Sequence, residues 1–240
     1  MADSSPPTTP IEVLGSLLRR PASGTWTALS YGKPGGFRRR QYLDRLRGLA
    51  AVGTNASAGV TAAGTQDTNL RQPLAAAVAE EEVARILSTL GISYTVWHDV
   101  ATDAAGARAD RKIDHIVLGP TGIFAVLSAD WGSALTLHKG EVASAGLRRG
   151  EKPLRSLYRR AHDFARTTGV RFNALMMVVP DDSVAVPLAV ASRRHGCPTL
   201  LVGRSWLPEV LQTKMGGMTV TSDDDLLAAR LRLAETIHFI

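Results

Sequence analysis

The chain has 240 residues, 45% hydrophobic and 21% charged, which suits a soluble globular protein with one full domain and additional segments. A net charge of +6 and a pI of about 9.9 favour an anionic partner, nucleic acid above all, although many mildly basic proteins bind no anion. The sequence shows no signal-peptide pattern and no run of ~18 apolar residues, and its one cysteine, Cys197, excludes an internal disulfide or a zinc cluster. We therefore expect a cytoplasmic protein with no membrane partner, and the oligomeric state stays open.

The first 70 residues are expected to form a flexible segment that contains one basic helix. Residues 1–10 are mostly Ser, Pro and Thr, a composition typical of disorder. A short helical pattern at 11–20 precedes a loop rich in Gly, Ser and Pro at 22–36. The pattern then predicts a basic helix at 37–51 and a linker of small and polar residues at 53–68.

Residues 71–185 have the pattern of an α/β domain, and residues 186–240 that of a C-terminal α/β extension packed on the same domain. Pro73 suits the first turn of a helix, and Gly91 ends its apolar periodicity. The order of elements predicts a mixed central sheet flanked by helices. The predicted elements are helix 73–90, strands 92–98, 112–118, 123–128 and 134–138, a helix opened by Pro153, strands 173–180 and 199–202, and helices 206–214 and 223–238.

The helix opened by Pro153 has a basic face opposite its apolar stripe. Basic side chains recur along this face at helical spacing, and Asp163 is the main counter-charge. A charged outer face is also the default for an amphipathic helix, so a solvated surface stays open as an alternative. If the face contacts phosphates, the nucleic-acid-binding residues are Arg155, Arg159 and Arg166, with Arg148 and Arg149 just before the helix.

A strand, a Gly-Pro-Thr-Gly turn and a second strand form the most informative stretch of the sequence. This hairpin places Asp114 on one strand and residues 127–129 on its partner. Two acidic groups on adjacent strands, with a lysine two residues after the second, can hold a divalent metal beside a phosphodiester. The metal activates water and the lysine steadies the developing charge.

The sequence here resembles the nuclease-related domain (NERD) family. The resemblance rests on Glu80-Glu81-Glu82-Val83-Ala84, His98-Asp99, Ile113-Asp114-His115 and Gly119-Pro120-Thr121-Gly122-Ile123-Phe124, and it spans about residues 74–180, under half of the chain. It implies a restriction-endonuclease-like α/β fold with a PD-(D/E)xK centre and Mg²⁺ as cofactor. Glu80 would match the family's helical glutamate and Asp114 its first metal-binding aspartate.

The chain departs from this pattern at two functional positions. Leu127 stands where the second acidic residue is expected and Ala129 where the lysine is expected. Lys112 lies two residues before Asp114, on the same face of the strand, so it could act as a displaced catalytic lysine. Asp130 could replace the missing acid only through a bulge. His115 should face away from Asp114 and serve packing.

Three functions remain compatible with the sequence. The first is a catalytically degenerate member that binds nucleic acid, with DNA as the expected form, and the lost residues at 127 and 129 favour it. The second is an active metal-dependent DNA endonuclease with a rearranged site built on Asp114, Glu80 and Lys112. The third is an α/β scaffold for protein interactions that binds no nucleic acid.

Overall fold

The computed structural model describes residues 27–53, 63–102, 112–194, 197–213 and 222–240, with only the backbone described at 48–53 and 63–71. The disorder expected at 1–10 and the helix expected at 11–20 lie outside these ranges. Among the described residues, no helix combines the length and the apolar character that crossing a bilayer requires.

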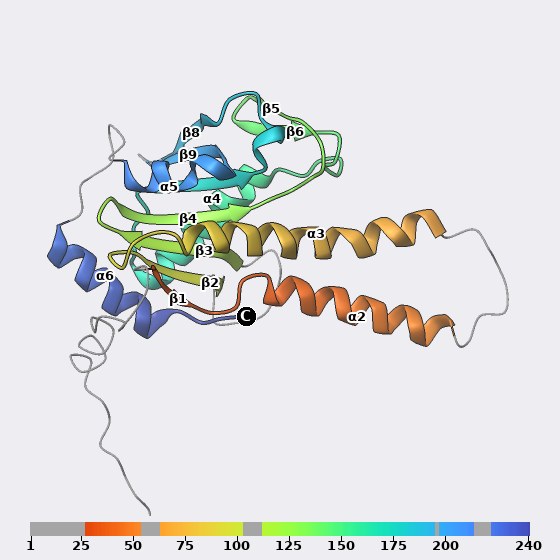
Figure 1. Ribbon diagram of the computed structural model, residues 1–240, viewed down its shortest axis with the longest axis horizontal. Coiled ribbons are helices and arrows are strands. Elements are labelled where there is room, and N and C mark those ends of the chain that lie inside the picture. The colour runs from red at the N-terminus through yellow and green to blue at the C-terminus, as the bar shows by residue number, and fades with distance from the viewer. Residues whose placement is uncertain (1–26, 54–62, 103–111, 195–196, 214–221) are drawn as a thin grey trace, which may run out of the picture.

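A seven-stranded mixed sheet forms the centre of the molecule (Figure 1), in the order β1-β2-β3-β4-β7-β9-β8. Strands β2, β3 and β4 are antiparallel, whereas β1 runs parallel to β2, and β4, β7 and β9 run parallel to one another. The edge strand β8 is antiparallel to β9. The strands are β1 Leu29–Tyr31, β2 Thr95–Ala101, β3 Lys112–Gly119, β4 Gly122–Ser128, β7 Ala174–Val179, β8 Leu188–Arg194 and β9 Cys197–Gly203.

The β3–β4 hairpin depends on its glycines. Gly122 has φ 133°, and a Cβ there would collide with the amide of Asn173, which accepts a hydrogen bond from the Ile123 backbone at 2.7 Å. A Cβ on Gly119 would collide with the ring of Tyr94. The turn therefore fixes the register that places Asp114 and Leu127 on adjacent strands, as the sequence predicts.

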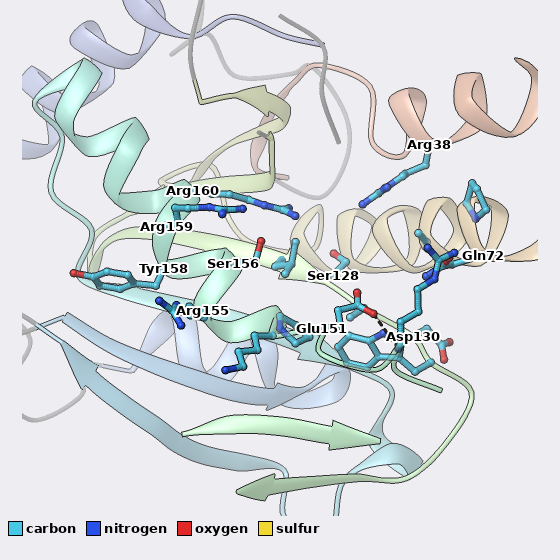
Figure 2. A pocket seen from close by; sticks show the side chains of 18 of the residues that line it. Arg38, Gln72, Ser128, Asp130, Glu151, Arg155, Ser156, Tyr158, Arg159 and Arg160 are labelled. Atoms are coloured by element: carbon cyan, nitrogen blue, oxygen red, sulfur yellow. Dashed lines mark hydrogen bonds between the residues drawn. The ribbon is translucent and has the colours of Figure 1, made fainter. Parts of the chain in front are cut away.

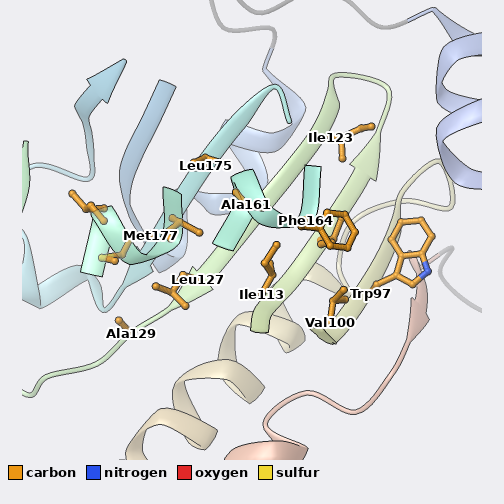
Figure 3. Packing of buried hydrophobic residues seen from close by; sticks show 14 of the residues in the cluster. Trp97, Val100, Ile113, Ile123, Leu127, Ala129, Ala161, Phe164, Leu175 and Met177 are labelled. Carbon is orange, nitrogen blue, oxygen red and sulfur yellow. The ribbon is translucent and has the colours of Figure 1, made fainter. Parts of the chain in front are cut away.

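Helices cover both faces of the sheet, so every residue of β3, β4 and β7 is buried. One face packs against α3 and α5 through residues such as Val83, Phe124 and Val210. The other packs against α4 and α6 through residues such as Phe164 and Leu233, and Figure 3 shows part of this second core. The helices are α2 Gly36–Gly53, α3 Ala63–Leu87, α4 Pro153–Thr168, α5 Leu207–Gln212 and α6 Asp223–Thr236.

Helices α2 and α3 lie side by side and extend beyond the sheet (Figure 1). The predicted basic helix is α2. The bidentate pair of Arg39 on α2 with Glu81 on α3 links the two helices. Because of this pairing, the basic residues of α2 lie near the end of the sheet at which β3 begins.

Three details of the predicted elements are wrong. The predicted loop 22–36 contains β1, which is too short for a periodic signal and is stabilised by pairing with β2. Helix α3 begins at Ala63, within the predicted linker, and Pro73 lies inside it. Strand β8 has no predicted counterpart. The strand expected at 134–138 is confirmed as β5, Leu135–His138, which pairs with β6, Glu141–Ser144, in a separate two-stranded sheet.

Candidate functional site: a buried lysine among carboxylates beside a cationic cleft

A buried ion cluster lies where β2, β3 and α3 meet. The Lys112 side chain is 0% exposed, and its Nζ lies 2.6 Å from Glu80 Oε2 and 3.2 Å from Asp114 Oδ1. It also donates a hydrogen bond to Asp99 Oδ1. The structure therefore brings together Glu80, Lys112 and Asp114, the three predicted catalytic residues, and adds Asp99 as a fourth member.

Backbone groups hold the two aspartates of this cluster in place. Asp99 has φ 53°, in the left-handed region, and its Oδ2 accepts a hydrogen bond from the Phe37 backbone at 3.0 Å. Asp114 Oδ2 accepts one from the Ser128 backbone at 2.8 Å, whereas Asp114 Oδ1 is buried and has only its ion pair with Lys112. Each aspartate is thus anchored by one oxygen and turns the other toward the ammonium.

Burial raises the pKa of Glu80, and the charges of the cluster raise that of Lys112. Burial, followed by the negative charge of Asp114, raises the pKa of Glu80 to about 8 despite the opposing attraction of Lys112. Burial alone would lower the pKa of Lys112, but the charges of Asp114, Glu80 and Asp99 outweigh it and raise that pKa. At neutral pH these raised pKa values keep Lys112 charged and Glu80 largely protonated.

As arranged, this cluster does not fit a divalent metal. The carboxylates surround an ammonium, and within the described ranges no three His, Cys, Asp or Glu side chains form a group suited to a metal ion. Magnesium needs near-octahedral oxygen coordination, for which Lys112 leaves no central position. Leu127 and Ala129, at the positions of the missing acid and lysine, lie close to Met177 on the α4 side of the sheet (Figure 3).

A second buried polar network crosses the sheet beside the ion cluster. Ser30 Oγ lies 2.7 Å from His98 Nε2, His98 Nδ1 lies 2.7 Å from His115 Nδ1, and His115 Nε2 lies 3.0 Å from Ser128 Oγ. Burial lowers the pKa of His98 to about 4 and that of His115 well below its ordinary value. Both imidazoles are therefore neutral. The network joins β1, β2, β3 and β4, and His115 contributes hydrogen bonds to His98 and Ser128 as well as packing.

An open cleft of about 1100 Å³ lies beside the ion cluster, between α2 and α3 on one side and α4 on the other (Figure 2). Leu127, Ser128 and Ala129 line it, so the positions at which the sequence resemblance placed the missing acid and lysine face this space. Arg38 links the two sites, because it lines the cleft while its Nε lies 3.5 Å from Glu80 Oε1. The charged side chains that line the cleft are Arg38, Arg45, Arg148, Lys152, Arg155, Arg159 and Arg160, against the acids Asp130 and Glu151.

The predicted nucleic-acid-binding residues divide between the cleft and the surface outside it. Arg148, Arg155 and Arg159 line the cleft, whereas Arg149 and Arg166 are exposed and are not among its lining residues. Glu141 of β6 orients α4 by accepting hydrogen bonds from the first-turn backbone amides of Leu154 and Arg155 at 2.8 and 3.1 Å. The helix therefore begins at a defined place beside the cleft.

Sequence reasoning missed three residues of the site. Asp99 belongs to the His98-Asp99 motif, but the sequence did not show that its left-handed backbone conformation directs its side chain toward Lys112. Arg38 belongs to the predicted basic helix, but the sequence did not show that this helix packs on α3. Arg160 is 9% exposed and donates to the Lys112 backbone carbonyl at 3.0 Å, a contact with no sequence signal.

Asp130 does not replace the missing acid. It follows β4, its Oδ1 accepts a hydrogen bond from the Gly132 backbone at 2.9 Å, and its Oδ2 lies 3.5 Å from Arg204 Nη2. It lines the cleft without joining the carboxylates around Lys112.

The mixed sheet, with Glu80 on a covering helix and Asp114 on a central strand, is an α/β architecture consistent with the restriction-endonuclease-like fold. Residues 75–179 match the family model described as the nuclease-related domain, NERD, so this part of the chain is similar to that family. No curated protein and no solved structure matches the chain. The family match ends with β7, although β1, β9 and β8 complete the same sheet and α2 forms part of the cleft.

Proposed function

We propose that this nuclease-related domain binds nucleic acid, with DNA as the first candidate, and does not cut it. The observation that carries this proposal is the position of Lys112, whose ammonium takes the centre of the carboxylate cluster. A buried ammonium held by three carboxyl groups is costly to displace, because its removal would leave buried negative charge uncompensated. The chain thus retains the residues of a metal centre in an arrangement that needs no metal.

The cleft supplies the binding surface. Seven of its lining side chains are Arg or Lys, and two are acidic. Arg155 and Arg159 are exposed on the first two turns of α4. Arginine side chains at a groove bind phosphate oxygens by charge-assisted hydrogen bonds, with no need for a particular base sequence. We therefore expect weak binding with little sequence preference.

The test is fluorescence anisotropy with labelled DNA at increasing salt. A protein that makes about four phosphate contacts loses roughly 100-fold in affinity between about 50 and 200 mM salt. Arg155→Glu combined with Arg159→Glu should abolish most binding and flatten the salt dependence. Arg166→Glu with Arg149→Glu is the matched control, because it makes the same charge change outside the cleft. Absence of binding by the parent at low salt would contradict the proposal and favour a protein-interaction scaffold.

One observation favours a second candidate, the metal-dependent DNA endonuclease. Lys112 lies beside Asp114 and Glu80, as a displaced catalytic lysine would have to. Under this candidate Mg²⁺ would have to separate Lys112 from both carboxylates. A plasmid-cleavage assay with Mg²⁺ and Mn²⁺ decides between the two candidates. Cutting that Asp114→Asn abolishes would overturn the non-cutting proposal, whereas cutting that survives this substitution points to a contaminating nuclease.

A further inference from the structure

The wall of the cleft on α4 combines cationic and aromatic side chains in a single stripe. Arg155, Tyr158, Arg159 and His162 are spaced three, one and three residues apart, which places them on one face of the helix, and all four line the cleft. The rings of Tyr158 and His162 are stacked, with centroids 6.2 Å apart and planes at 26°. Tyr158 and Trp131 are half-buried and line the same space, so each offers part of a ring to a ligand.

We infer that the cleft takes single-stranded nucleic acid in preference to duplex, an inference that rests on the proposed function. In a duplex the bases are stacked inside, and mainly the phosphates face a protein groove. Aromatic side chains in the cleft would therefore have no base faces to contact. A single strand exposes both phosphates and base faces, and proteins that bind it combine a cationic groove with aromatic stacking platforms. The rings of Tyr158 and Trp131 supply the platform, and Arg155 and Arg159 the phosphate contacts.

The two walls of the cleft support the same ligand. Arg38 and Gln72 lie across the cleft from Arg155, Tyr158 and Arg159 (Figure 2). Arg148 donates a hydrogen bond to Gln72, which ties the loop before α4 to α3 at one end of the cleft. The cleft has a volume of about 1100 Å³, which is near the upper end of the range for small-molecule pockets. This volume is enough for a short length of single strand.

The experiment compares the binding of three labelled probes by fluorescence anisotropy at low salt. The probes are oligo-dT, oligo-rU and a DNA duplex, each about 16 nucleotides or base pairs long. Either single strand should bind more tightly than the duplex, and the ratio of oligo-dT to oligo-rU identifies whether DNA or RNA is preferred. Tyr158→Ala should weaken single-strand binding by roughly 5- to 100-fold, and duplex binding much less. Tyr158→Phe keeps the ring and should bind as the parent does. Trp206→Ala, at an exposed aromatic outside the cleft, is the control.

A spectroscopic signal separates stacking from a structural role of the rings. A base stacked on Trp131 quenches indole fluorescence, so oligo-dT should quench the parent protein and quench Trp131→Phe much less, although this variant retains binding. Equal or tighter binding of the duplex, with no effect of Tyr158→Ala, would overturn this inference and leave the proposed function standing. Failure of all three probes to bind would overturn both.

Discussion

Replacing Lys112 tests whether its ammonium neutralises the carboxylate cluster. In Lys112→Met the volume is nearly kept, but Asp99 and Asp114 lose their buried counter-charge. Each retains one hydrogen bond from a backbone amide, and Glu80, with its pKa raised to about 8, is largely protonated at neutral pH. The loss is therefore at least that of one broken buried ion pair, about 3–5 kcal/mol.

Urea unfolding and thermal melting measure this loss. For a chain of this size it corresponds to a decrease in Tm of roughly 6–20 °C. The decrease should be smaller at pH 5 than at pH 8, because Glu80, with its pKa raised to about 8, is protonated at pH 5 and partly ionised at pH 8, where it adds uncompensated buried charge. A Lys112→Met variant that unfolds within about 1 kcal/mol of the parent at pH 8 would refute the reasoning.

The same position gives a test for a latent metal site. Lys112→Ala leaves both space and negative charge among Glu80, Asp99 and Asp114. Millimolar Mn²⁺ or Mg²⁺ should therefore raise the Tm of this variant, with about 1.4 kcal/mol of stabilisation at ten times the Kd. Neither the parent nor Lys112→Met should respond. An equal metal response of the parent would show that the ammonium does not exclude the ion.

Two further predictions concern the missing catalytic residues and the buried histidines. Leu127→Glu with Ala129→Lys should not by itself give Mg²⁺-dependent plasmid cutting, because Lys112 still holds the carboxylates; cutting by this double variant would contradict that view. The folded-state pKa of His98 is lowered to about 4, so the stability it contributes is present above pH 6.5 and is lost as pH falls toward 4, by up to about 3 kcal/mol. Urea unfolding from pH 7 to 4 should show this loss in the parent and in the exposed control His138→Gln, and a smaller loss in His98→Gln. Parallel pH profiles for the parent and His98→Gln would contradict the assignment.

The sequence by itself determined the centre of the fold. Continuous apolar runs predict β4 and β7, and the glycines of the 119–122 turn predict the hairpin that pairs β4 with β3, because both signals are local and depend on backbone conformation and burial. The family motifs likewise pointed to Glu80 and Asp114, and the spacing of Lys112 before Asp114 predicted that their side chains share a face of the strand. Residues 75–179 match the nuclease-related domain that these motifs suggested.

Only the tertiary structure decided what these residues do together. The left-handed conformation of Asp99, the packing of α2 on α3 and the burial of Arg160 against the Lys112 carbonyl depend on contacts between segments far apart in the chain. Sequence periodicity shows which face of an element is apolar, but not which other element covers it or which charges meet there. The environment of an ionisable group depends on those contacts, so the sequence could propose Lys112 as a catalytic lysine, whereas the fold places it as the cation within the carboxylate cluster.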